Sequence, residues 1–168
     1  MNRSVLTLLL LLCGCSSVQA PESTSRETQQ STSPSLEEIS APPELVCDQN
    51  ASARKEVRVR HIHIEAFAAG HHPAVHVATP EEAMAAYKSL QRAREDLAKG
   101  ESFEVVLNRY STPSKSGGGP DGDIGFVKRG FLTSEFNRVA FCIPVGVISP
   151  VFRTSFGFHV AQVTDVRL

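Results

Sequence analysis

The sequence lacks three features that would assign it to a class at once. It has no excess charge, because 17 Lys and Arg residues face 18 Asp and Glu residues, for a formal net charge of −1. Nucleic-acid-binding domains need a basic surface, so this class is disfavoured. It has no run of about 18 or more apolar residues that would remain as a membrane span and no internal repeat. Its 168 residues suit one domain with appendages.

The N-terminus has the pattern of a targeting segment. Arg3 supplies a positive charge, and the apolar stretch 5–12 is too short to span a bilayer. The letters LCGC resemble a bacterial lipobox, whose cysteine becomes the lipidated first residue of the mature protein. We therefore expect a lipoprotein signal peptide at 1–15 with lipid on Cys15. An ordinary signal peptide that is cleaved after Ala20 is the alternative.

The stretch after the targeting segment is poor in large apolar residues. It is rich in Ser, Thr, Gln and Pro up to about residue 43, and such a composition cannot bury a core. We expect residues 16–56 to form a flexible tether, with the part from Leu36 onward open to a second reading as a short docking segment. By similarity to lipoproteins of Gram-negative bacteria, Ser16 after the lipidated cysteine favours the outer membrane, facing the periplasm.

Cysteine is scarce once the targeting segment is set aside. Of four cysteines, only Cys47 and Cys142 remain for the folded part. An exported protein enters a compartment that permits disulfides, so these two could form a bridge. The alternative is that Cys142 is simply a small buried apolar residue.

The folded domain is expected at 57–168, beginning with a strand. Ile62 and Ile64 alternate with Val57, Val59, His61 and His63, so the two sets should lie on opposite faces. The clearest helix follows: Thr79 is its N-cap, Pro80 and Glu82 complete the signature of a helix start, and Gly100 ends it.

The remaining pattern alternates helices and strands. Two more short helices, two more strands and a possible short strand near Val147–Ser149 are expected. The helices cover 102–111, with Ser102 as the cap, and 133–141, and the strands cover 123–128 and 156–168. This order predicts an α+β fold, and about 110 residues can hold a single core.

Six segments in this order resemble the parvulin family of peptidyl-prolyl isomerases. They include RHIHI, KGESFEVVLNRYS, GDIGFVKRGFLTSEFNRVAF and PVGVISPVFRTSFGFHV, and the resemblance covers residues 57–168. It implies a four-stranded antiparallel sheet flanked by helices. It also implies an enzyme that isomerises X–Pro bonds of exported proteins, with unfolded or extended polypeptides as partners and without a metal or cofactor.

The resemblance assigns residues to the site. His61 and His159 match a histidine pair beneath the bound prolyl peptide, and Thr154 matches the threonine that supports this pair. The apolar wall that takes the proline ring matches Ile124, Leu132 and Phe136, and Phe141 matches an aromatic residue at the base of the pocket. Gly125 and Gly157 match glycines of turns.

The chain departs from the family pattern at several points. Many parvulins have an Asp or Cys directly after the second helix, whereas residues 111–114 read STPS. His63 replaces a commonly aliphatic residue. The loop after the first strand has no Lys or Arg, so we expect no requirement for a phosphorylated substrate.

Two alternatives to an active isomerase stay open. The first is a weakly active or inactive module that holds extended, Pro-containing segments, which the missing acid or thiol favours. The second is a metal-handling lipoprotein that uses His71, His72 and His76, with His63 nearby, since imidazole suits zinc or nickel. That spacing matches no strong metal template.

Overall fold

The structure is a computed structural model, and it describes residues 34–40, 43–67, 76–111, 119 and 121–168. These residues belong to one compact unit that spans Ser33–Leu168. The expected lipidation site at Cys15, the expected signal peptide and most of the expected tether lie outside the described residues, as do His71 and His72. No helix within the described part is long and apolar enough to cross a bilayer.

Four antiparallel strands form one sheet in the order β2-β1-β4-β3, as the family resemblance implied. The strands are β1 (Glu56–Glu65), β2 (Asp123–Lys128), β3 (Phe152–Thr154) and β4 (Gly157–Arg167). The first and last strands are therefore the central pair. They stay in register from Val59, opposite Val163, to Glu65, opposite Gly157.

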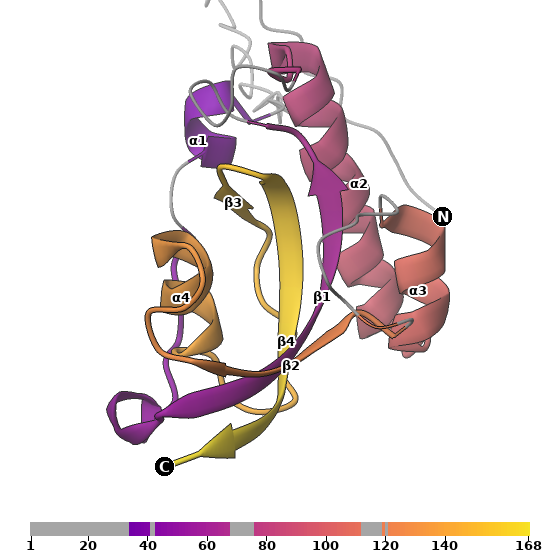
Figure 1. The fold of residues 1–168 in the computed structure, drawn as a ribbon. Helices are drawn as coiled ribbons and strands as arrows, with labels where there is room; N and C mark the ends of the chain where they lie inside the picture. Colours follow the sequence, from indigo (N-terminus) through magenta and orange to yellow (C-terminus); the bar gives the residue numbers. More distant parts are fainter. Residues whose placement is uncertain (1–33, 41–42, 68–75, 112–118, 120) are drawn as a thin grey trace, which may run out of the picture. The chain divides into compact units, whose positions relative to one another are not determined.

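Helices cover both faces of this sheet (Figure 1). On one face lie α2 (Pro80–Ala98) and α3 (Phe103–Tyr110), and α4 (Ser134–Ala140) lies on the other. The predicted capping box of α2 forms between Thr79 and Glu82, and Ser102 caps α3 as predicted. Thr133 caps α4.

Side-chain alternation along the central strands divides the interior into two clusters. Ile62, Phe158 and Val160 pack with α2 and α3 in the first cluster. Val57, Val59, Ala161 and Val163 pack with α4 in the second. The sequence therefore predicted correctly which residues of β1 share a face.

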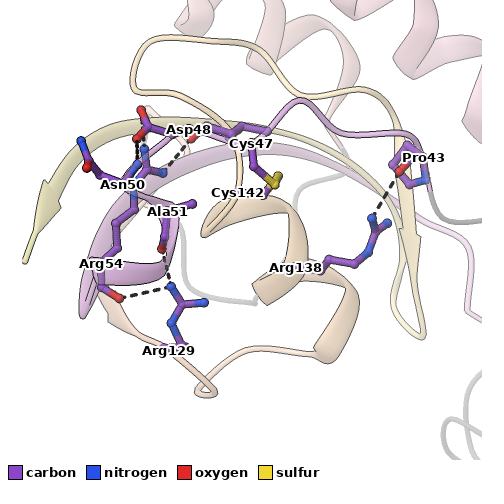
Figure 2. The surroundings of a disulfide bond; sticks show 10 residues. Pro43, Cys47, Asp48, Asn50, Ala51, Arg54, Arg129, Arg138 and Cys142 are labelled. Carbon is purple, nitrogen blue, oxygen red and sulfur yellow. Dashed lines mark hydrogen bonds and ion pairs between the residues drawn. A yellow bond between two sulfur atoms is a disulfide. The ribbon is translucent and has the colours of Figure 1, made fainter.

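The packed part begins earlier than the expected boundary at Val57. Helix α1 (Leu36–Ser40) buries Ile39 against the first cluster, and a single 3-10 turn, η1 (Ala51–Ala53), follows. Cys47 and Cys142 form a disulfide (Figure 2). The sequence left open whether these two cysteines pair, and in the structure they do. The bond also favours the interpretation of the segment from Leu36 onward as a docking segment.

Polar contacts hold the stretch 43–56 beside the disulfide, and we call this stretch the strap. Buried Arg54 pairs with Asp48 at 3.1 Å and donates to the Ile143 carbonyl at 2.7 Å. Arg129 donates to the Ala51 carbonyl at 2.6 Å (Figure 2). The sequence did not predict this docking, because it depends on a disulfide and on polar contacts with residues far along the chain.

One strand differs from the expectation. Residues 147–149 provide only a single bridge, between Ile148 and Gln162, and the fourth strand is β3, three residues further along. Three residues are too few to show a period of two in the sequence, so the pattern could not locate this strand.

Candidate functional site

A cavity of about 470 Å³ opens on the face of the sheet that carries α4. Its walls combine histidine rings, apolar side chains and two threonines, with no Lys, Arg, Asp or Glu among the described lining residues. The lining residues are His61, His63, Ile124, Val127, Phe131, Leu132, Thr133, Phe136, Thr154, Phe156 and His159. The composition suits an uncharged, largely apolar ligand group.

Strand pairing brings the histidines together. His61 and His63 are two residues apart on β1 and so share a face, and His63 lies directly opposite His159 on β4. The rings of His61 and His159 are nearly parallel, with centroids 5.5 Å apart. Phe136 from α4 meets both of these rings edge-on, each at 5.5 Å between centroids.

Hydrogen bonds join the histidine pair to Thr154. The Nδ1 atoms of His61 and His159 lie 3.3 Å apart, and the His159 Nε2 lies 2.8 Å from the Thr154 hydroxyl. The same hydroxyl oxygen accepts the backbone N–H of Phe156 at 3.1 Å.

One assignment of tautomers uses every hydrogen in this chain of contacts. The Thr154 hydroxyl donates to His159 Nε2, and His159 Nδ1–H donates to His61 Nδ1. In the reverse assignment the Thr154 hydroxyl hydrogen has no acceptor in this chain of contacts. We therefore infer that the hydrogen of His61 resides on Nε2.

Two glycines allow the backbone to approach the histidines. Gly157 has φ +144°, and a Cβ there would collide with the backbone of Ile64 on β1 and of Ala66 just after it. Gly122 has φ +74°, and its carbonyl accepts the His61 N–H at 3.0 Å. Glycine is needed at both positions because other residues rarely adopt these angles.

Burial keeps the histidines neutral. Desolvation, with a smaller contribution from the neighbouring His63, lowers the pKa of His61 to about 4. Desolvation also holds the pKa of His159 well below its usual value, again with the other two histidines adding to the effect. Burial lowers the pKa of His63 as well. At pH 7 the site therefore presents uncharged imidazoles.

Of the four residues expected to contact the substrate, three line the cavity: Ile124, Leu132 and Phe136. Phe141 does not, because it ends α4 and is buried in the second core cluster with the Arg129 guanidinium 4.4 Å from its ring centre. The structure thus places Phe141 in the core behind the site.

Five other residues that line the cavity had no predicted role in the site: His63, Val127, Phe131, Thr133 and Phe156. His63 lines the cavity, and its predicted place on the face of His61 was the available signal. Phe131 and Phe156 also line it, and they are 81% and 40% exposed at its rim. Exposed aromatic residues in turns give no periodic signal, so only the folded chain reveals them.

Two further expectations depend on residues that the structure does not describe. Residues 112–114, where the sequence has no acid or thiol, lie outside the described residues. In the described ranges no three His, Cys, Asp or Glu side chains gather closely enough to hold a metal ion.

Comparison with known proteins identifies relatives. The sequence model of the Rotamase family, described as a PPIC-type PPIase domain, matches residues 61–165. Foldase protein PrsA of Bacillus subtilis (strain 168) is 35% identical over 81 residues, which cover 48% of this chain and 27% of the relative. Chaperone SurA of Alkalilimnicola ehrlichii is 35% identical over 113 residues, which cover 67% of this chain and 23% of the relative.

The fold is shared with solved structures. A PpiC-type peptidyl-prolyl cis-trans isomerase domain superposes with a TM-score of 0.54 at 22% identity, covering 68% of this chain and 93% of that chain. At this identity the likeness shows the fold alone. The chain spans less than a third of the length of the curated relatives named above.

Proposed function

The chain belongs to the Rotamase family of PPIC-type peptidyl-prolyl isomerase domains, and on that premise we propose that it catalyses cis/trans isomerisation of X–Pro bonds. The observation that carries the proposal is the position of an apolar cavity directly beside a neutral histidine pair. Ile124, Leu132 and Phe136 form a wall of suitable size and polarity for a proline ring.

The chemistry requires no nucleophile. Amide resonance sets a rotation barrier of roughly 18–20 kcal/mol, and an X–Pro bond takes tens to hundreds of seconds to isomerise unaided. Rotation by a quarter turn removes the resonance and its charge separation. A water-poor apolar cavity disfavours the dipolar planar amide, and walls that fit the twisted amide bind it more tightly than the ground state.

In this mechanism His61 and His159 shape the site through hydrogen bonds, and Thr154 supports them from β3. Their lowered pKa values keep the rings neutral at pH 7. A charged ring would attract water and fix a counterion in the cavity, which would oppose the desolvation that catalysis needs.

We further propose that the substrates are unphosphorylated, extended segments of exported proteins. The described lining carries no Lys or Arg that could pair with a phosphate. The exposed rim residues Phe131 and Phe156 suit apolar neighbours of the proline. Relatives named as a foldase and a chaperone agree with polypeptide substrates.

The proposed location is the bacterial cell envelope, with lipid on Cys15 as the anchor and the outer membrane as the favoured site. The Cys47–Cys142 disulfide supports an oxidising compartment. Labelling with a radioactive or alkyne-bearing fatty acid tests the anchor. Incorporation that disappears in Cys15→Ala supports it, and unlabelled protein that is cleaved after Ala20 contradicts it.

A holding module without much catalysis is the second candidate. The 81% exposure of Phe131 favours it, because large exposed aromatic side chains commonly mark binding surfaces.

One experiment separates the two candidates. Exchange NMR on an unphosphorylated X–Pro peptide gives the isomerisation rate, and chemical-shift changes in the protein report binding. The proposal predicts catalysed exchange that falls about ten-fold or more in Ile124→Ala and Leu132→Ala. The control Val105→Ala, on an exposed site of α3 outside the cavity, should retain the rate. Binding without catalysed exchange would favour the holding module.

A further inference from the structure

Three side chains form a single row across the sheet on the face of the cavity. His63 on β1 and Phe152 on β3 each lie directly opposite His159 on β4. Because β4 lies between β1 and β3, these two neighbours approach His159 from opposite sides. The ring of His159 is therefore enclosed between two other rings.

The geometry of the row is that of stacked rings. The centroids of His63 and His159 are 4.5 Å apart with an interplanar angle of 8°. Those of Phe152 and His159 are 5.3 Å apart at 22°. Contacts on both faces limit tilting of the His159 ring, whereas its two nitrogens are restrained only by His61 and Thr154 at the ring edge.

His63 is itself held in place. The Ser111 hydroxyl accepts the His63 backbone N–H at 3.2 Å and donates to its carbonyl at 3.0 Å. The His63 Nε2 lies 3.4 Å from the Phe156 carbonyl oxygen. The side chain is buried, with 4% of the residue exposed. A restrained, buried ring can serve as a fixed surface for its neighbour.

The polar character of His63 is not explained by its hydrogen bonds. Its Nδ1 is buried and has no hydrogen-bond partner among the described residues. Burying such a nitrogen is unfavourable, so an apolar residue would fill the space at lower cost. Besides the Nε2 contact with the Phe156 carbonyl, His63 differs from an aliphatic side chain in the flat ring that lies on His159.

We propose that His63 is a positioning residue for His159: its ring fixes the plane of His159 so that both nitrogens reach their partners. A tilted ring would move Nδ1 away from His61 and Nε2 away from the Thr154 hydroxyl. Hydrogen bonds weaken steeply with such misalignment. The effect on isomerisation rests on the proposed function, whereas the effect on the His159 ring does not.

The test compares two replacements of the same residue. His63→Phe keeps a flat ring on His159, and His63→Leu fills the space without one. The ring nitrogens of His159, observed by ¹⁵N NMR, report which nitrogen carries the hydrogen. Exchange NMR on an X–Pro peptide reports the rate. His76→Ala is the histidine control, because His76 lies outside the cavity and its side chain is 72% exposed.

The proposal expects His76→Ala to retain the ¹⁵N pattern of His159 and the wild-type rate. It expects His63→Phe to retain the ¹⁵N pattern and to isomerise the peptide several times faster than His63→Leu. It expects His63→Leu to change the pattern toward mixed tautomers and to lower the rate about ten-fold, as small misplacements of site groups do. Thermal unfolding of the two His63 variants checks that they are folded.

Either of two results would overturn the proposal. One is a His63→Leu protein that is folded and has the wild-type His159 spectrum. The other is a His63→Phe protein that is as altered as His63→Leu. If the wild type catalyses no exchange, the proposed function fails, but the ¹⁵N spectra still decide whether His63 positions His159.

Discussion

The two faces of the central strand pair carry side chains with different roles. On one face Ile62, Phe158 and Val160 are fully buried beneath α2 and α3. On the other, His61, His63 and His159 lie beside a cavity. Successive residues of one strand thus alternate between a filled core and a face that combines a second core cluster with a cavity. The comparison teaches that one face of a sheet can serve packing alone while the other combines packing with the candidate site.

The largest expected effect comes from opening the filled face. Phe158→Ala removes a fully buried ring from the first cluster and should lower the free energy of unfolding by about 3–5 kcal/mol. Urea denaturation measures it. Val105→Ala on the exposed surface of α3 should change stability by no more than about 0.5 kcal/mol. Equal losses in both variants would contradict the burial of Phe158 in the first core cluster.

The cavity face depends on the strap. The disulfide joins Cys47 to Cys142, directly after α4, and closes a loop across 95 positions (Figure 2). Replacing both cysteines by serine should lower the free energy of unfolding by about 2–4 kcal/mol. Dithiothreitol should destabilise the wild type comparably and leave the double variant unchanged. A reductant effect on the double variant would show that the disulfide is not its cause.

Acid should weaken the cavity face first. His61 has a pKa of about 4 in the fold and about 6.5 when unfolded, so the unfolded chain binds more protons between these values. Stability is therefore complete above about pH 6.5 and falls as the pH drops toward 4, by at most about 3 kcal/mol from His61. Denaturation at several pH values measures this slope, and His61→Phe should flatten it. An unchanged slope in His61→Phe would contradict the assignment of this pH dependence to His61.

The smallest effect concerns a helix that covers the filled face. The Ser102 hydroxyl accepts the Val105 N–H at 3.3 Å and caps α3. Ser102→Ala should cost about 1 kcal/mol of stability, and the isomerisation rate of the folded protein should not change. Ser102→Asp, which restores a capping acceptor, should recover the loss. Failure of this recovery would mean that the cap contributes little.

Much of this division could be predicted from the sequence. The alternation 57–64 placed His61 and His63 opposite Ile62 because side-chain direction in a strand follows from position alone. For the same local reason, the cap residues Thr79 and Ser102 predicted where α2 and α3 begin. The closure of His159 onto His61 came from the family resemblance, since strand pairing joins residues 98 positions apart.

The rest could not be predicted because it depends on contacts between distant segments. The docking of the strap, for example, includes a hydrogen bond from Arg54 to the carbonyl of Ile143, 89 residues away. The three-residue strand β3 is too short to carry a pattern, yet it supplies Phe152 to the row with His159. The burial of Phe141 behind the cavity likewise depends on where α4 ends, and the sequence of this helix does not predict that position.

The most direct test of the account uses two neighbouring residues of β4, one from each face. His159→Ala alters the cavity face and Val160→Ala alters the filled face. Exchange NMR on an unphosphorylated X–Pro peptide, with the folded fraction measured in the same samples, gives a rate per folded molecule. The account predicts a fall of about ten-fold or more for His159→Ala and an unchanged rate for Val160→Ala. Equal loss in both variants would contradict it.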